Sequence, residues 1–378
     1  MMRAVLVCAV IGTWGGFGAA VRGDEVGESV MLDLPGTGTD PTAIDFFALP
    51  TLAGEHALVS QGDDEWQFRL HNYLAWHDGR YWCIWSHGPV IEDQARQEVR
   101  YATSDDGLHW SEPATLTGPP PDEYGYIARG LWLRDGQLLA LVSLYEAPTA
   151  FYGDLELRAF AWNAATGGWD DAGLVFDDAI NNFPPKPLPS GEWLMSRRDA
   201  QHHVTMLIGG VKALDDWRVV PVAKYTLADG ARVEEPYWWA LPDGRLMGLF
   251  RDNSRSRRIY RAFSSDDGAS WSTPARTNFP DATSKFFALR TSRGYWVMVS
   301  NPNPAGRRPL CLSLSTDGET FTRMAQLPIE SERGQTLQYP HVIEHDDHLL
   351  VAFSRNKRAI EVVRIALDET DRLLDDNQ

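Results

Sequence analysis

The chain has 378 residues, of which 43% are hydrophobic, and its formal net charge at neutral pH is −17. This length suffices for one large domain or two small ones. The strong negative charge argues against nucleic acid or an anionic membrane surface as a partner, so an anion-binding site here has to be a local cluster of arginines. Abundant tryptophan (15), glycine (32) and proline (23) suit an all-β architecture with many turns.

The N-terminus has the pattern of an exported protein. Residues 1–23 combine a short basic start at Arg3, an apolar run and small residues, which predicts a cleaved signal peptide and a secreted or periplasmic protein. An uncleaved membrane anchor is the alternative. No later stretch is long and apolar enough to insert into a membrane. Residues 24–41 are rich in Gly, Asp and Thr and are predicted to form a loose linker. Cys83 and Cys311 each lie in a strand-like run, which predicts buried thiols with no disulfide.

A turn-centred pattern then recurs about every 50 residues, a spacing typical of repeated sheet modules. Examples are WHDGRYW, LRDGQLL, LPDGRLM and TSRGYWV, each with apolar residues on both sides of a turn. Glycine or aspartate at the centre fits a hairpin turn that needs positive φ. The six turn positions are Gly79, Gly136, Gly191, Gly244, Gly294 and Asp347.

A second motif follows the hairpins in phase. TSDDGLHW and SSDDGASW are complete Asp-boxes, and ATGGW, LDDW and LSTDGETF are degraded versions. In such a loop we expect the aspartate to accept hydrogen bonds from backbone N–H groups and the aromatic side chain to fill the gap between strands. The aromatic positions are Trp110, Trp169, Trp217, Trp271 and Phe321.

Six hairpins in register with these loops predict a single all-β domain over residues 42–378, a six-bladed β-propeller. The last repeat supplies about three strands before the chain ends, and residues 43–60 are predicted to supply the fourth and close the ring. Closure of this kind removes exposed sheet edges. The charged tail, residues 368–378, is predicted to be frayed.

The repeat also predicts where a binding site lies. The start of the first strand and the end of the second strand of every blade should meet at one mouth of the channel, opposite the turns. The polar residues at these positions form the default site hypothesis. They include Arg69, Tyr126, Asn181, Glu234, Glu235, Ser284 and Tyr339 before the turns, and Arg198, Arg251, Asn301, Ser354 and Arg355 after them. Each arginine alone is more simply a surface ion-pair partner, but four around one mouth are less easily explained in that way. His202 and His203 lack a third ligand at a recognisable spacing, so no metal site is predicted.

At these residues the chain resembles the sialidase superfamily, whose members carry BNR or Asp-box repeats. The resemblance implies three arginines that bind a substrate carboxylate. Phe68-Arg69 corresponds to the first arginine motif, Arg251 follows Glu235 at the expected separation, and Arg307 fits the third position, with Arg308 as the alternative.

The resemblance further implies Tyr339 as the nucleophile, Glu235 as its base and Asp93 as the acid/base residue, with no cofactor. Guanidinium groups recognise a carboxylate through paired, charge-assisted hydrogen bonds. A tyrosine nucleophile avoids the repulsion that a carboxylate nucleophile would meet from an acidic sugar.

The leading hypothesis is therefore a secreted exo-glycosidase that removes a terminal acidic sugar from a glycan with retention of configuration. Two alternatives remain open. One is a propeller glycosidase or lyase for a uronic-acid polysaccharide, with His71, His87 or His341 as a base. The other is a propeller that binds glycans without cleaving them.

Overall fold

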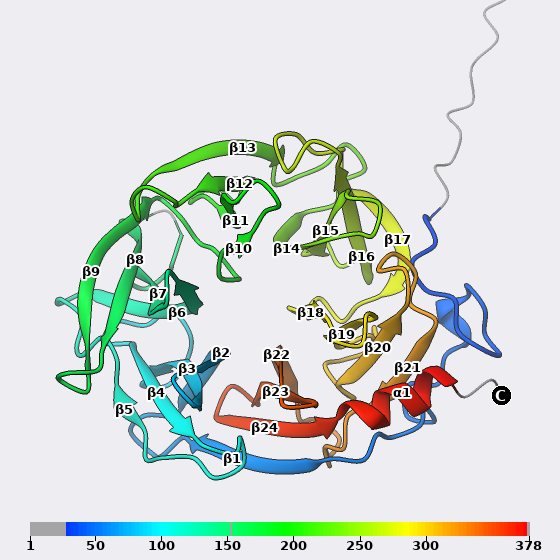
Figure 1. Ribbon diagram of the computed structural model, residues 1–378, viewed down its shortest axis with the longest axis horizontal. Helices are drawn as coiled ribbons and strands as arrows, with labels where there is room; N and C mark the ends of the chain where they lie inside the picture. The colour runs from blue at the N-terminus through cyan, green and yellow to red at the C-terminus, as the bar shows by residue number, and fades with distance from the viewer. Residues whose placement is uncertain (1–27, 152, 376–378) are drawn as a thin grey trace, which may run out of the picture.

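A computed structural model describes residues 28–151 and 153–375, and the predicted signal peptide lies outside these residues. In this part of the chain six four-stranded antiparallel sheets are arranged in a ring around a central axis (Figure 1). The prediction of an all-β, six-bladed β-propeller is confirmed. No helix in the described residues is long and apolar enough to cross a membrane.

The first three blades run from an inner strand to an outer strand in chain order. Blade one is β2 (Phe68–His77), β3 (Arg80–Gly88), β4 (Glu98–Ser104) and β5 (Ala114–Thr115). Blade two is β6 (Tyr124–Arg134), β7 (Gln137–Glu146), β8 (Leu155–Asn163) and β9 (Gly168–Asp177). Blade three is β10 (Lys186–Pro187), β11 (Trp193–Arg198), β12 (Val204–Gly209) and β13 (Trp217–Ala223).

The last three blades complete the ring. Blade four is β14 (Val233–Ala240), β15 (Leu246–Asp252), β16 (Arg258–Ser264) and β17 (Ala275–Pro280). Blade five is β18 (Phe287–Arg290), β19 (Trp296–Ser300), β20 (Cys311–Ser315) and β21 (Arg323–Gln326). Blade six is β22 (Leu337–His345), β23 (His348–Arg355) and β24 (Ala359–Ala366), with β1 (Glu55–Gln61) as its outer strand.

The ring is closed by strands from both ends of the chain. Strand β1 pairs antiparallel with β24, so the sixth sheet has the order β1-β24-β23-β22. The fourth strand of this blade therefore comes from the N-terminal segment that the sequence predicted. The pairing covers the edge that β24 would otherwise expose.

The turns and Asp-boxes form as predicted. All six central turn residues have positive φ, for example +87° at Gly244 and +56° at Asp347. In the Asp-box between β16 and β17, the Asp266 carboxylate accepts hydrogen bonds from the Ser270 N–H (2.8 Å) and from the hydroxyl of Ser264 (2.8 Å). The Trp271 indole N–H donates to the Gly268 carbonyl at 3.1 Å. These local bonds fix the loop between the third and fourth strands.

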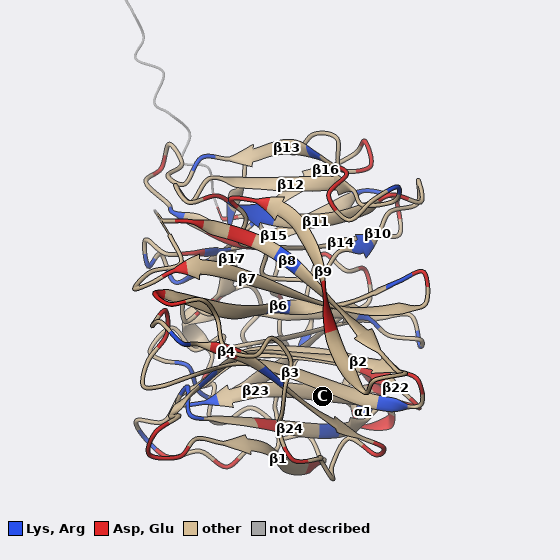
Figure 2. Ribbon diagram, turned by 90° about the vertical axis from the view of Figure 1, so that its left-hand side faces the viewer, with Lys and Arg blue, Asp and Glu red and all other residues tan. Residues whose placement is uncertain are grey.

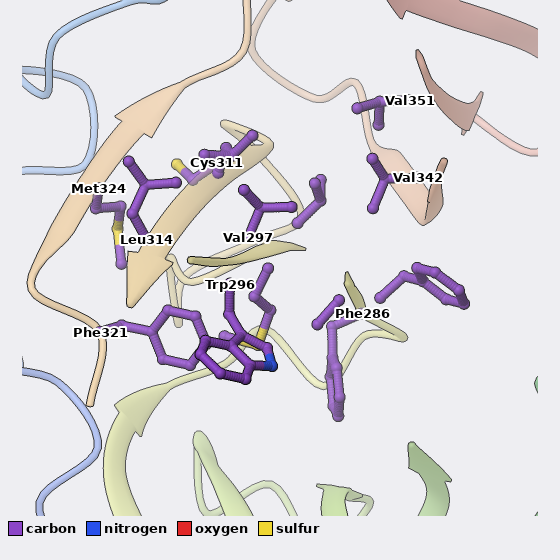
Figure 3. Close-up of a cluster of buried hydrophobic side chains, with 14 of the residues drawn as sticks. Phe286, Trp296, Val297, Cys311, Leu314, Phe321, Met324, Val342 and Val351 are labelled. Atoms are coloured by element: carbon purple, nitrogen blue, oxygen red, sulfur yellow. The ribbon is translucent and has the colours of Figure 1, made fainter. Parts of the chain in front are cut away.

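Apolar side chains fill the space between neighbouring blades. Cys311 is fully buried and lies with Val297 and Leu314 in the cluster shown in Figure 3. Cys83 is likewise a buried free thiol, and burial raises the pKa of both. Seen from the side, the strands are mostly uncharged and the charged residues gather mainly in the loops at their ends (Figure 2). Charged side chains therefore lie largely on the two faces of the propeller, where the loops are.

Two predictions about the ends of the domain are wrong. The described part of the predicted linker is packed, because Met31 and Leu32 are fully buried and Leu32 pairs with Phe321. A short 3-10 helix, η1 (Pro41–Ala43), follows this segment. The described part of the predicted frayed tail instead lies in α1 (Leu367–Asp375), which is held by the buried side chains of Leu367 and Thr370. The η1 helix contacts β17 of blade four, and α1 contacts β21 of blade five and β24 of blade six (Figure 1).

Candidate active site at one mouth of the channel

The inner strands bring the site together through β-bulges near their starts. The strand register shifts at four of them, and the extra residues include His71, Arg129, Glu235 and Tyr339. His71, Glu235 and Tyr339 have φ values between 53° and 54°. A bulge leaves a residue outside the regular ladder and re-aims its side chain. Proline follows both Glu235 and Tyr339, which suits a bulge because proline cannot donate a ladder hydrogen bond.

Arg251 joins the two principal candidates. Its Nη1 atom donates to Glu235 Oε2 at 2.9 Å and to the Tyr339 hydroxyl at 3.4 Å. Glu235 and Tyr339 come from the inner strands of blades four and six, whereas Arg251 lies near the end of the second strand of blade four. The structure therefore brings together three residues that the sequence predicted for one site.

A second arginine lies behind Glu235. Arg198 forms a buried ion pair with Glu234, and its Nη2 is 3.8 Å from Glu235 Oε1. Asn182 also donates to that oxygen, at 3.3 Å. Burial alone would raise the pKa of Glu235, but the charges of Arg251, Arg198 and Lys285 outweigh burial and hold it at about 2. Glu235 is therefore ionised at any physiological pH.

Lys285 supplies a buried cation from the start of blade five. Its Nζ donates to the Tyr73 hydroxyl at 2.7 Å and lies 5.8 Å from the centre of the Tyr339 ring. Burial lowers the pKa of Lys285 to about 7, and the nearby Arg129 and Arg198 charges act in the same direction while Glu235 opposes them. Lys285 is thus poised between its charged and neutral forms near neutral pH.

The structure distinguishes Arg307 from Arg308. The Arg307 guanidinium lies over the Tyr339 ring, 5.6 Å from its centre, and donates to the Thr283 carbonyl at 2.7 Å. Arg308 instead donates to the Ser331 carbonyl and lies over the Phe47 ring. Arg307 is therefore the one of the two that belongs to the cluster.

Asp93 lies in the loop after β3. Burial raises its pKa to about 6, and the neighbouring Glu92 charge acts in the same direction while Arg129 and Lys357 oppose the shift. Arg129 is buried, and the charges of Asp93, Glu92 and Glu235 all act on it. The Arg129 guanidinium therefore interacts electrostatically both with Asp93, the predicted acid, and with Glu235.

Besides Arg308, three predicted residues do not join this cluster. Arg69 turns towards β1, where its guanidinium donates to Ser60 Oγ (3.2 Å) and to the carbonyls of residues 61, 66 and 68. Arg355 forms an ion pair with Glu361. The Asn301 side-chain amide donates a hydrogen bond to the backbone carbonyl of Leu337. The structure therefore does not bring Arg69 together with Arg251 and Arg307, the other two arginines of the predicted clamp.

Sequence reasoning missed four polar residues of the cluster, Arg129, Asn182, Lys285 and Tyr73. Arg129 lies at the bulge of β6, yet the fixed spacing from the turn pointed to Tyr126. Lys285 lies one residue beyond the predicted Ser284. A prediction that allowed extra residues in each inner strand would have found both.

The three candidate histidines occupy different places. His71 contacts Tyr339, with ring centres 5.6 Å apart, and its two nitrogens contact Ser86 Oγ and Glu92 Oε1 at 3.1 Å each. His87 stacks on Trp66. His341 lines a cavity of about 670 Å³ with Trp238 and Phe287. Among the residues described, no group of three or more His, Cys, Asp or Glu side chains could hold a metal ion.

An arginine-rich pocket adjoins the cluster. It has a volume of about 470 Å³. Arg251 and Arg307 belong to its lining, so the pocket opens beside the two guanidiniums that contact Tyr339. The other residues that line it are Tyr225, Arg232, Asn253, Arg255, Arg257, Ala282 and Thr283.

Comparisons with known proteins agree with this architecture. Residues 180–351 match the family described as a BNR repeat-like domain. The matched residues cover a little under half of the chain, and the propeller as a whole has the fold of solved sialidases. By sequence alone, no curated protein matches the chain.

Several solved structures share the fold at low sequence identity. A Hadza microbial sialidase superposes with a TM-score of 0.68 at 13% identity, over 83% of this chain and 68% of that one. A protein of unknown function from Dyadobacter fermentans gives 0.67 at 14%, over 82% and 98%. Trypanosoma rangeli sialidase in complex with sialic acid gives 0.61 at 15% identity, over 85% of this chain and 60% of that one. These identities establish the fold, so the activity has to be argued from the site.

Proposed function

We propose that this protein is an exo-glycosidase that removes a terminal acidic sugar of the sialic acid type from glycans, with retention of configuration. The sialidase-like propeller indicates a protein that cleaves or binds glycans. The finer proposal rests on one observation, the contact of Arg251 with both Glu235 and Tyr339. The signal peptide predicted in residues 1–23 further leads us to propose that the enzyme acts outside the cytoplasm.

In this proposal Arg251 and Arg307 bind the carboxylate of the sugar. Both guanidiniums line the pocket beside Tyr339, and a guanidinium can donate two parallel hydrogen bonds to a carboxylate. Arg198 remains buried behind Glu235 and stabilises its negative charge. The substrate carboxylate thereby lies close to the reacting phenol.

Tyr339 would act as the nucleophile. Its hydroxyl oxygen bonds to the anomeric carbon as the glycosidic C–O bond breaks, and its proton passes to the ionised Glu235. The surrounding cations Arg251, Arg307 and Lys285 stabilise the negative charge that develops on the phenol oxygen. A neutral phenol also approaches an acidic sugar without the repulsion that a carboxylate would meet.

Asp93 would protonate the leaving oxygen and then take a proton from the water that hydrolyses the tyrosyl intermediate. A carboxyl group with a pKa of about 6 carries a proton in mildly acidic solution and can donate it. Two displacements at the same carbon give net retention.

The test compares hydrolysis of sialyllactose by the wild type, Tyr339→Phe and a matched control, Tyr101→Phe. Tyr101 lies on β4 in the first blade, within an aromatic cluster around Trp82. We expect Tyr339→Phe to lose at least about a hundredfold in kcat, since it removes the nucleophile, and the control to remain active. Equal turnover by the wild type and Tyr339→Phe would refute the nucleophile assignment. Absence of turnover in the wild type would refute the sugar class.

A lyase acting on a uronic-acid glycan is a second candidate, favoured by the position of His71. Its ring lies beside Tyr339, and burial lowers its pKa to about 4, so the imidazole is unprotonated at neutral pH and has a free nitrogen lone pair that can accept a proton. An unsaturated product that absorbs in the ultraviolet would select this reaction, and loss of that product in His71→Gln would confirm the base.

A further inference from the structure

The arginine-rich pocket has more positive charge than one carboxylate requires. Five guanidiniums line it, from Arg232, Arg251, Arg255, Arg257 and Arg307, and none of the described lining residues is acidic. This occurs in a chain whose net charge is −17. Like charges that share a pocket repel one another, so the arrangement is stabilised when anions occupy it.

Among the described contacts, Tyr339 meets Arg251 and Arg307 but none of the other three arginines. Arg232 precedes β14, and Arg255 and Arg257 lie in the loop between β15 and β16. The side chains of Arg255 and Arg257 are exposed. Among the described residues, none makes a hydrogen bond or ion pair with the Arg255 side chain, so its guanidinium is free to meet a ligand.

Asp252, the carboxylate closest in sequence to Arg255 and Arg257, already accepts hydrogen bonds from its own loop and from Arg232. Asp252 accepts hydrogen bonds from the backbone N–H groups of Arg232 (2.9 Å), Ser254 (2.8 Å) and Ser256 (2.7 Å). It also accepts one from the Ser254 hydroxyl, and its side chain is buried. Asp252 therefore shapes the loop that presents the arginines, and its oxygens are directed to that loop.

We propose that Arg232, Arg255 and Arg257 bind a second anionic group on the substrate, a sulfate ester or a carboxylate, on the sugar next to the one held by Arg251 and Arg307. The substrate class is then a glycan with two or more neighbouring negative charges. This inference rests on the proposed function, because it takes the Tyr339 side of the pocket as the place of the terminal sugar. Sulfate and carboxylate both match the fork of a guanidinium.

The pocket size agrees with this assignment. About 470 Å³ lies within the range of small-molecule sites and is shared by both groups of arginines. Nucleic acid, the other common polyanion, is disfavoured because the chain as a whole is strongly acidic and would repel an extended phosphate backbone.

The experiment measures dissociation constants by calorimetry in the Tyr339→Phe background, so that no ligand is consumed. Two pairs of probes are used: sialyllactose and its derivative with a sulfate ester on the galactose, and a uronic acid disaccharide with and without a sulfate ester. We expect the sulfated member of at least one pair to bind about tenfold or more tightly, the effect of one added charge-assisted contact. We expect Arg255→Gln/Arg257→Gln to abolish this preference.

The matched control is Arg80→Gln/Lys212→Gln, which removes the same charge from exposed residues outside the pocket. It should keep the preference for the sulfated probe, and circular dichroism should show both double variants folded. Arg255→Gln alone, which disturbs no contact of the folded chain, should lose part of the preference.

Equal binding within both pairs, or a preference that survives in Arg255→Gln/Arg257→Gln, would overturn the inference, as would absence of binding in every pair. The proposed function is read out separately, by hydrolysis of sialyllactose in the wild type. If the wild type cleaves sialyllactose but binds the sulfated and unsulfated probes equally, the proposed function is supported and the second anion subsite is refuted. If only the sulfated uronic acid disaccharide binds more tightly than its unsulfated partner, the second anion subsite is supported and the terminal sugar is a uronic acid instead of a sialic acid.

Discussion

Replacing Glu235 by glutamine should destabilise the protein by an amount that depends on pH. Glu235 is 5% exposed and faces Arg251 at 2.9 Å and Arg198 at 3.8 Å. Its pKa falls from an ordinary value of 4.5 to about 2 in the folded protein. That difference corresponds to about 3 kcal/mol of folding free energy, because every tenfold change in proton affinity is worth about 1.4 kcal/mol.

The sign of the effect follows from the lowered pKa. The stabilisation is complete above the unfolded pKa of 4.5 and is lost as pH falls towards the folded pKa of about 2. The free energy of unfolding of the wild type should therefore exceed that of Glu235→Gln by about 3 kcal/mol at neutral pH. About 2 kcal/mol of this difference should disappear between about pH 6 and pH 3.

The assay is urea-induced unfolding followed by tryptophan fluorescence across this pH range. Glu55→Gln is the control, since Glu55 pairs with Arg364 at an exposed position and should cost less than about 1 kcal/mol. A difference between the wild type and Glu235→Gln that stays constant with pH would refute the reasoning, because it would mean that the charge of Glu235 does not carry the stabilisation.

Three further predictions concern packing, lysine and acid catalysis. Gly248→Ala should cost about 1–3 kcal/mol of stability, because the new methyl group would lie 2.9 Å from the Trp271 ring; Gly306→Ala, which meets no atom within 4 Å, should change thermal stability little. The free energy of unfolding of the wild type should fall as the pH is lowered from about 10 to about 7. In this range Lys285 is protonated in the unfolded chain but largely neutral in the folded chain, where its pKa is about 7. Unfolding curves of Lys285→Met should lack this change. The kcat/KM for glycoside hydrolysis should fall above about pH 6 as Asp93 loses its proton, and a fall that persists in Asp93→Asn would contradict its role as the acid.

The blades were predictable because their signals are local. The turn at Gly244 needs positive φ within a few residues, and the Asp266 carboxylate binds backbone groups of its own loop. Repetition of such signals at a fixed period defines the phase of every blade, and this phase alone places Glu235 beside Arg251. The pairing of β1 with β24 followed from counting strands in the last repeat.

The parts of the site that were not predicted depend on which way a side chain points and on contacts between different blades. A one-residue bulge reverses which side of a strand faces the channel. In β2 the bulge presents His71 to Tyr339, while Arg69 turns towards β1. Lys285 and Tyr73 meet across the channel from blades five and one, a contact for which neither local sequence contains a signal.

The same bulges explain why strained backbone and buried charge occur together at this end of the channel. Glu235 and Tyr339 adopt positive φ although neither is glycine, and such conformations cost about 1–3 kcal/mol each. The surrounding sheets can maintain them because the inner strands are held on both sides by neighbouring blades. At the opposite end, positive φ is left to turn residues such as Gly244 and Asp347, for which it costs little. Strained backbone and buried charge therefore coincide at the mouth with Tyr339, where a phenol and a carboxylate contact the same guanidinium, and this coincidence is the physical argument that supports the proposed catalytic role of this mouth.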